Sequence, residues 1–105
     1  MTRRAALRWI CLTLALGSVP ARAAGHTIVM DGTAFSPAVV TVERGDRVTW
    51  VNKDPFPHTA TAQNRAFDSG SMAEGASWTW MADKPGTFDY VCTLHPTMKA
   101  RLVVQ

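Results

Sequence analysis

The 105-residue sequence predicts an all-β domain, a β-sandwich built from short strands. Two features predict this fold. Short runs rich in valine, threonine and aromatic residues recur along the chain after residue 25, and residues that favour turns separate them. The same region shows no long stretch with the 3.6-residue period of an amphipathic helix. Seven strands at this spacing are typical of two sheets packed face to face.

The expected strands follow one another with turn signals between them. They cover residues 26–30, 38–42, 46–51, 58–62, 77–81, 87–92 and 99–104. The turn signals are Asp31-Gly32, Ser36-Pro37, Arg44-Gly45-Asp46, Asp54-Pro55, Glu74-Gly75 and Lys84-Pro85-Gly86. Glycine, proline and aspartate favour the backbone conformations of turns, so these signals mark where strands end.

Two of the strands also predict which side chains are buried. In the third strand, Val48 and Trp50 alternate with Arg47 and Thr49, so one face is expected to point into the core and the other toward solvent. In the fifth strand, Trp78 and Trp80 share a face. We expect both rings in the core or at its rim.

A motif rich in possible metal ligands follows the sixth strand. Cys92, His95 and Met98 stand at the spacing C-x-x-H-x-x-M, and His58 lies far upstream on another strand-like segment. One thiolate, two imidazoles and a thioether form the ligand set that selects copper at a trigonal electron-transfer site with a weak axial sulfur. Each three-residue interval suits a tight turn, so we expect two consecutive turns to aim the three side chains at one point.

Each of these residues has an ordinary structural explanation when it stands alone. A lone cysteine in an apolar strand is usually a small buried hydrophobic residue, and a lone methionine usually fills a core. Their occurrence in phase with a histidine, directly after a strand, favours a metal site instead. Structural zinc prefers four thiolate or imidazole ligands, so Met98 argues against zinc.

The first 23 residues predict a cleaved export signal. A basic segment ending at Arg8 precedes an apolar stretch, residues 9–19, that is too short to span a bilayer. Ala21-Arg22-Ala23 then fits an A-x-A cleavage site. The mature protein is expected to be residues 24–105, a single domain without a membrane span, in the periplasm. The signal leaves the general secretory and the twin-arginine routes both open.

Removal of the signal changes the charge of the protein. The whole chain has a formal net charge of +3, but four of its eleven basic residues and none of its eight acidic ones lie in the signal. The mature chain is therefore nearly neutral, and no basic stripe remains to suggest nucleic acid or an anionic membrane surface as a partner. Cys11 leaves with the signal, so Cys92 has no internal disulfide partner. In an oxidising compartment a bound metal would protect its thiol.

With these residues in view, the mature sequence resembles the cupredoxins, the small blue copper proteins, and is most similar to their amicyanin-like and plastocyanin-like members. The similar segments are Phe35-Ser36-Pro37, residues 45–52, Pro57-His58-Thr59, residues 67–70, residues 85–92 and His95-Pro96-Thr97-Met98. The loop from Cys92 to Met98 is the most specific of them. Its spacing is that of amicyanin, the shortest in the family.

The resemblance implies an eight-stranded Greek-key sandwich that binds one copper ion, as Cu(I) or Cu(II). His58 and His95 would supply Nδ1, Cys92 the thiolate, and Met98 a long axial sulfur, with the ring edge of His95 at the surface. Amicyanin and plastocyanin have an asparagine directly after the first histidine, and it tethers the two ligand loops. Thr59 stands at that position here, and its hydroxyl can serve as the tether.

The resemblance also implies a function. A monomer would shuttle single electrons between redox partner proteins, with a dehydrogenase or a cytochrome c as donor or acceptor. A copper-binding or trafficking protein is the alternative, but the exposed methionine-rich or histidine-rich runs that it would need are missing from the sequence. An enzyme is not expected, because nothing supplies an oxyanion hole or an orienting acid for a Cys92–His95 pair.

Overall fold

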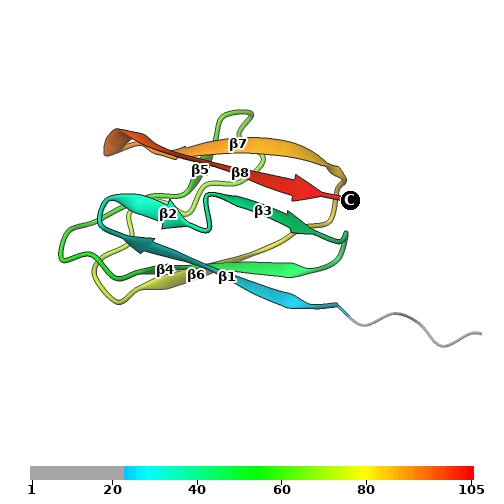
Figure 1. Cartoon of the computed structure of the whole chain (residues 1–105), viewed down its shortest axis with the longest axis horizontal. Helices are drawn as coiled ribbons and strands as arrows, with labels where there is room; N and C mark the ends of the chain where they lie inside the picture. Colours follow the sequence, from blue (N-terminus) through cyan, green and yellow to red (C-terminus); the bar gives the residue numbers. More distant parts are fainter. Residues whose placement is uncertain (1–22) are drawn as a thin grey trace, which may run out of the picture.

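The computed structural model describes residues 23–105, and the predicted export signal lies outside the described residues apart from Ala23. The described chain forms eight strands and no helix, and thus no helix that could cross a membrane. Figure 1 shows them as two layers facing each other. The strands are β1 (Gly25–Asp31), β2 (Ala34–Ser36), β3 (Val39–Val42), β4 (Arg47–Asn52), β5 (Thr61–Ala62), β6 (Ser77–Met81), β7 (Gly86–Cys92) and β8 (His95–Val104).

The eight strands form two four-stranded sheets. One sheet has the order β2-β1-β4-β6 and the other has the order β3-β8-β7-β5. The β1–β4 and β3–β8 pairs are parallel and the remaining pairs are antiparallel. From β2 to β7 every connection passes from one sheet to the other, as in a Greek-key sandwich. The prediction of an all-β Greek-key sandwich with seven to eight strands is confirmed.

Each of the seven predicted strands overlaps an observed strand, although β8 begins at His95 rather than at residue 99, and two further regions differ from the prediction. The sequence did not predict β2, because it is only three residues long and its segment ends in a turn signal. It pairs with β1 through a hairpin turn at Gly32 and Thr33, whose φ angles are 61° and 57°. Positive φ at both central residues is the requirement of a type I′ turn, whose twist matches that of the flanking strands.

The second difference concerns residues 58–62, which were predicted as one strand. Only β5 belongs to the sheet, and His58 instead forms an isolated bridge with Met72. The two residues exchange both backbone hydrogen bonds, from His58 N–H at 3.1 Å and from Met72 N–H at 2.8 Å. The backbone of His58 is therefore fixed by a partner outside the sheet, although the prediction of a strand there was wrong.

Trp50 lies at the centre of the core between the two sheets. Its ring centroid lies 5.2 Å from that of Phe67 and 5.6 Å from those of Trp78 and Tyr90. Val48 and Trp50 are fully buried, as their alternation predicted, and Trp78 packs against the core at its rim. Large aromatic side chains bury about 150–250 Å² each, so this cluster supplies much of the hydrophobic stabilisation of the fold.

Candidate metal centre

The β7–β8 hairpin carries three of the predicted ligands. It lies at the end of the sandwich opposite the C-terminus (Figure 1). Cys92 pairs with His95 across a two-residue turn, and the next pair along the ladder is Val91 with Lys99. One step on β7 therefore corresponds to four steps on β8, so residues 96–98 form a three-residue bulge.

The bulge changes one detail of the predicted loop. The first tight turn, from Cys92 to His95, is confirmed. The second expected turn, from His95 to Met98, lies within β8, where residues 96–98 form the bulge. Pairing on both sides of the bulge brings His95 and Lys99 beside the adjacent residues Cys92 and Val91, so residues 96–98 loop out of the ladder.

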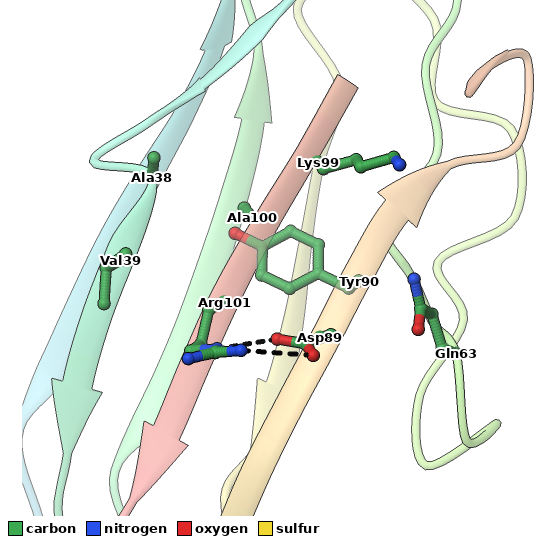
Figure 2. A pocket seen from close by; sticks show the side chains of 8 residues that line it. All are labelled: Ala38, Val39, Gln63, Asp89, Tyr90, Lys99, Ala100 and Arg101. Atoms are coloured by element: carbon green, nitrogen blue, oxygen red, sulfur yellow. Dashed lines mark hydrogen bonds and ion pairs between the residues drawn. The ribbon is translucent and has the colours of Figure 1, made fainter. Parts of the chain in front are cut away.

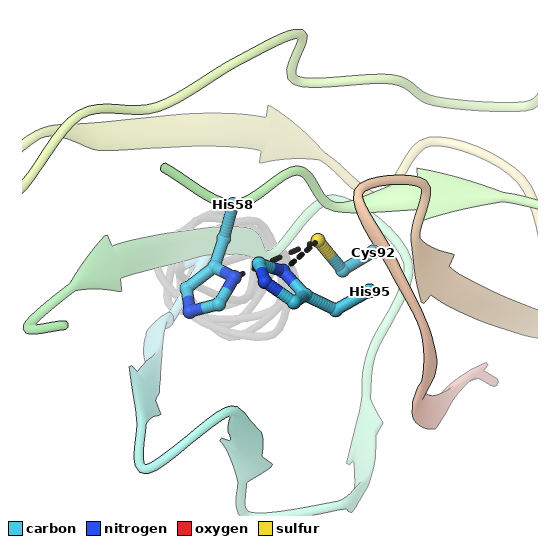
Figure 3. A group of neighbouring side chains, drawn as sticks. All are labelled: His58, Cys92 and His95. Atoms are coloured by element: carbon cyan, nitrogen blue, oxygen red, sulfur yellow. Dashed lines mark hydrogen bonds between the residues drawn. The ribbon is translucent and has the colours of Figure 1, made fainter. Parts of the chain in front are cut away.

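Three of the four predicted ligands come together in space, as Figure 3 shows. One donor atom from each of His58, Cys92 and His95 lies within 4.8 Å of the other two. Cys92 Sγ is 3.6 Å from His58 Nδ1 and 3.7 Å from His95 Nδ1. Metal bonds of about 2.0–2.3 Å at trigonal angles require donors roughly 3.5–4.0 Å apart. The sulfur–nitrogen separations of the cluster therefore fit one metal ion.

Burial differs among the four predicted ligands. His58 and Cys92 are fully buried, and Met98 is 2% exposed within the bulge of β8. His95 is half-buried, as expected for a ring whose edge reaches the surface. A buried thioether three residues after His95 fits a soft axial donor, which suits copper better than zinc.

The orientation of the His58 ring is fixed by Asp54. His58 Nε2 lies 2.7 Å from Asp54 Oδ2, and both side chains are buried. An ionised carboxylate can only accept hydrogen bonds, so Nε2 carries the proton and Nδ1 keeps its lone pair. Nδ1 is also the ring nitrogen that lies near Cys92 Sγ. Nδ1 is thus the nitrogen available to a metal.

Asp54 itself is held by the turn between β1 and β2. Gly32 N–H donates to Oδ1 and Thr33 N–H donates to Oδ2, each at 2.8 Å. The hydrogen bond with His58, followed by those from the two backbone amides, lowers the pKa of Asp54 to about 2. The sequence signalled Asp54 only as a turn residue before Pro55. No spacing rule distinguishes such an aspartate from one that orients a histidine.

Thr59 connects the two loops that carry the ligands. Its N–H donates to Cys92 Sγ at 3.3 Å, and its Oγ1 accepts the N–H of Thr93 at 2.9 Å. The hydroxyl thus tethers the loop of His58 to the hairpin of Cys92, the role expected for the residue directly after His58. A donor next to the sulfur stabilises negative charge on a thiolate.

Apolar side chains cover the edges of the cluster. The Phe56 ring lies 5.2 Å from His58 and 5.5 Å from His95, measured between centroids. Phe56 is 39% exposed and Leu94 is 51% exposed. Pro57 and Pro96 are also exposed. The protein therefore presents an apolar surface around the ring of His95.

A shallow cavity of about 390 Å³ lies elsewhere, on β3, β7 and β8 (Figure 2). Its lining includes Asp89 and Arg101, whose side chains form an ion pair at 2.7 Å. Both members of the pair are about half exposed, and such surface pairs contribute little to stability. The cavity shares none of its lining residues with the cluster of His58, Cys92 and His95.

An eight-stranded sandwich with a histidine–cysteine–histidine cluster at one end defines a class of small metal-binding β proteins. The chain belongs to the cupredoxin-like domain family, which it matches over residues 4–104. It is 30% identical over 97 residues to amicyanin-alpha of Methylorubrum extorquens, covering 87% of this chain and 82% of that protein. It is 34% identical over 84 residues to plastocyanin of Scenedesmus fuscus, covering 68% of this chain and 86% of that protein.

The same fold occurs within a larger protein. The chain superposes with a TM-score of 0.73 and 26% identity on a copper-containing nitrite reductase from Thermus scotoductus. The alignment covers 83% of this chain but only 23% of the nitrite reductase.

Proposed function

We propose that this protein is a small blue copper protein that carries single electrons between redox partners. One copper ion would be held by His58, Cys92, His95 and Met98. The observation that supports this most is the separation of Cys92 Sγ from the two Nδ1 atoms, 3.6 and 3.7 Å, which suits a trigonal site. The similarity to amicyanin and plastocyanin supports the same function.

Copper would carry the electron, and the side chains around it would orient and stabilise its ligands. Bound copper supplies a one-electron couple between Cu(II) and Cu(I). Asp54 keeps the Nδ1 lone pair of His58 available, and the N–H of Thr59 stabilises the Cys92 thiolate. Neither contact involves the metal, so both can form in either oxidation state. The ligands therefore need to move little when an electron arrives.

Electrons would enter and leave through His95. Its ring is half-buried, whereas His58 and Cys92 are fully buried. The exposed apolar surface around it can exclude water in a brief encounter without holding the partner for long. We expect the protein to act as a monomer, with a dehydrogenase or a cytochrome c as donor or acceptor.

Exposed basic side chains favour an acidic partner. Lys53 and Lys99 are exposed and follow directly after β4 and after the bulge of β8. Arg101 contributes less, because Asp89 pairs with it. Exposed charges mainly affect the association rate, so this preference should weaken as ionic strength rises.

We propose that residues 1–23 form a cleaved export signal and that residues 24–105 act as one domain in the periplasm. Cys92 is the one cysteine of the described residues, and its side chain is fully buried. Burial and metal ligation would both protect this thiol in an oxidising compartment.

An electron carrier fits the described residues better than an enzyme or a copper-trafficking protein. The likeness to nitrite reductase covers less than a quarter of that enzyme, and it supports a shared fold. Among residues 23–105, Met81 is exposed, whereas Met30, Met72 and Met98 are buried. A metal-delivery surface rich in exposed methionines is therefore absent from this part of the chain.

Titration of the purified mature protein with copper(II) tests the proposed function. We expect an intense blue charge-transfer band that saturates at one equivalent of copper and bleaches reversibly on reduction. Absorption and native mass spectrometry measure the colour and the stoichiometry together. A colourless or pale complex would rule out the blue copper site.

Replacement of Met98 by leucine tests the axial ligand. The Met98→Leu protein should stay blue, but its reduction potential should rise, because the lost sulfur donor favours copper(II). Leucine has a similar volume, so the packing of this buried position is largely kept. Voltammetry measures the potential, and a value equal to that of the wild type would show that Met98 is not an axial ligand.

A further inference from the structure

A chain of three hydroxyl groups leads away from the metal centre to a carboxylate. Thr93 Oγ1 lies 3.1 Å from Thr59 Oγ1, which lies 3.0 Å from Thr61 Oγ1. Thr61 Oγ1 lies 3.0 Å from Asp68 Oδ1. Thr59 and Thr61 are only 5% and 7% exposed, so water has little access to the middle of the chain.

The carboxylate fixes the direction of every hydrogen bond in this chain. Ionised Asp68 can only accept, so Thr61 donates its single hydroxyl proton to it. Thr61 Oγ1 must then accept the hydroxyl proton of Thr59. With its own proton committed, Thr59 Oγ1 can only accept from Thr93, which offers both its hydroxyl and its N–H. The Thr59 hydroxyl therefore has a single orientation, in which its oxygen accepts the N–H of Thr93.

The near end of the chain adjoins two metal ligands. Thr59 directly follows His58, and its N–H donates to Cys92 Sγ. Thr93 directly follows Cys92 and occupies the turn before His95. The bond between Thr59 and Thr93 therefore sets the position of one ligand loop relative to the other. The far end is fixed as well, because Asp68 Oδ1 also accepts the N–H of Gly70 at 2.9 Å.

We infer that Asp68 is a positioning residue of the metal centre and that it acts through Thr61 and Thr59. This inference rests on the proposed copper site. Hydrogen bonds to a charged acceptor are stronger than neutral ones, and successive bonds polarise one another. The chain of hydrogen bonds thus makes Thr59 Oγ1 a stronger acceptor for the N–H of Thr93. If it is broken, the Thr59 hydroxyl can rotate and the two loops become less firmly joined.

A looser junction between the loops should affect the two oxidation states of copper unequally. Copper(II) depends more strongly on a fixed set of ligands, whereas copper(I) tolerates fewer. Weakening the chain should therefore raise the reduction potential and accelerate release of copper(II). It should also expose the N–H of Thr93 to hydrogen exchange, even in the metal-free protein.

Thr61→Val is the first test, with Thr61→Ser as its matched control. Valine keeps the shape of threonine but interrupts the chain, whereas serine keeps the hydroxyl. In the metal-free protein, Thr61→Val should speed exchange of the Thr93 amide roughly threefold to tenfold, the effect of weakening one hydrogen bond. In the copper protein it should raise the potential, and Thr61→Ser should restore both properties. Equal behaviour of the valine and serine variants would overturn the inference.

Asp68→Asn provides the second test, with Asp83→Asn as the control for loss of charge. Asparagine can still accept from Thr61 and Gly70, but its amide also permits the opposite bond direction. Asp83 is exposed and lies outside the chain, so its variant reports the effect of charge alone. Asp68→Asn should change the Thr93 exchange rate and should raise the potential more than Asp83→Asn does. Identical effects of Asp68→Asn and Asp83→Asn would show that Asp68 acts only through its charge and not through the hydrogen bonds.

The exchange measurement separates this inference from the proposed function. Blue protein with an unchanged Thr93 exchange rate in Thr61→Val and Asp68→Asn would overturn the inference and leave the copper site standing. Protein that shows the exchange changes but never turns blue would instead refute the copper site and, with it, the assignment of Asp68 to a metal centre.

Discussion

The Cys92→Ser protein should lose the intense blue band completely and still fold as a β-sandwich. The band arises from charge transfer between thiolate sulfur and copper, and a serine hydroxyl keeps its proton at neutral pH and is a poor ligand for copper. The fold should persist because the main aromatic cluster, centred on Trp50, does not involve Cys92. Absorption spectra of copper-loaded samples and far-ultraviolet circular dichroism measure the two outcomes.

Thr93→Ser is the matched control for Cys92→Ser. It changes the neighbouring residue of the same hairpin turn and keeps the hydroxyl that bonds to Thr59. This control should remain blue at full intensity. If the Cys92→Ser protein kept the band, the sulfur assigned to the metal would be wrong.

The Asp54→Ala protein should bind copper roughly 10–100-fold more weakly, the usual effect of removing a residue that orients a metal-bound histidine. Alanine leaves His58 Nε2 buried without its partner and frees the backbone N–H groups of Gly32 and Thr33. The imidazole can then place its proton on Nδ1, the atom that the metal needs. Competition with a chelator of known affinity measures the loss.

Two variants separate the orientation of His58 from the loss of a negative charge. Asp54→Asn keeps an oxygen that can accept from Nε2, so its affinity should fall between those of the wild type and Asp54→Ala. Asp31→Ala removes an exposed carboxylate beside the same turn and should bind copper nearly as tightly as the wild type. Equal losses in Asp31→Ala and Asp54→Ala would show that charge, rather than orientation, is responsible.

Much of the fold followed from the sequence because its signals are local. The alternation of Val48 and Trp50 with polar neighbours depends only on the two-residue period of a strand, and their burial is confirmed. The spacing of Cys92 and His95 was also informative, because a two-residue turn necessarily brings its flanking residues together. His58, by contrast, lies far upstream, so its residue type rather than its spacing joined it to them.

The remaining features depend on how the folded elements pair and pack. Asp54 reads as a turn residue in the sequence, and its contact with His58 appears only when the β1–β2 turn closes over it. The bulge after His95 is likewise a property of pairing between β7 and β8. A local pattern specifies neither feature, because Asp54 is held by amides 21 and 22 residues away and the bulge depends on the register of β7 against β8.

The bulge separates the three ligands of the hairpin from the regular ladder of β7 and β8. Pairing of β7 with β8 is regular from Gly86 and Val104 up to Val91 and Lys99, and the three hairpin ligands lie beyond that last pair. Residues can therefore be added to or removed from the segment between Val91 and Lys99 without shifting the ladder below it. The hairpin tip is an exchangeable module, and loop grafting could alter the reactivity of the metal while the sandwich stays the same.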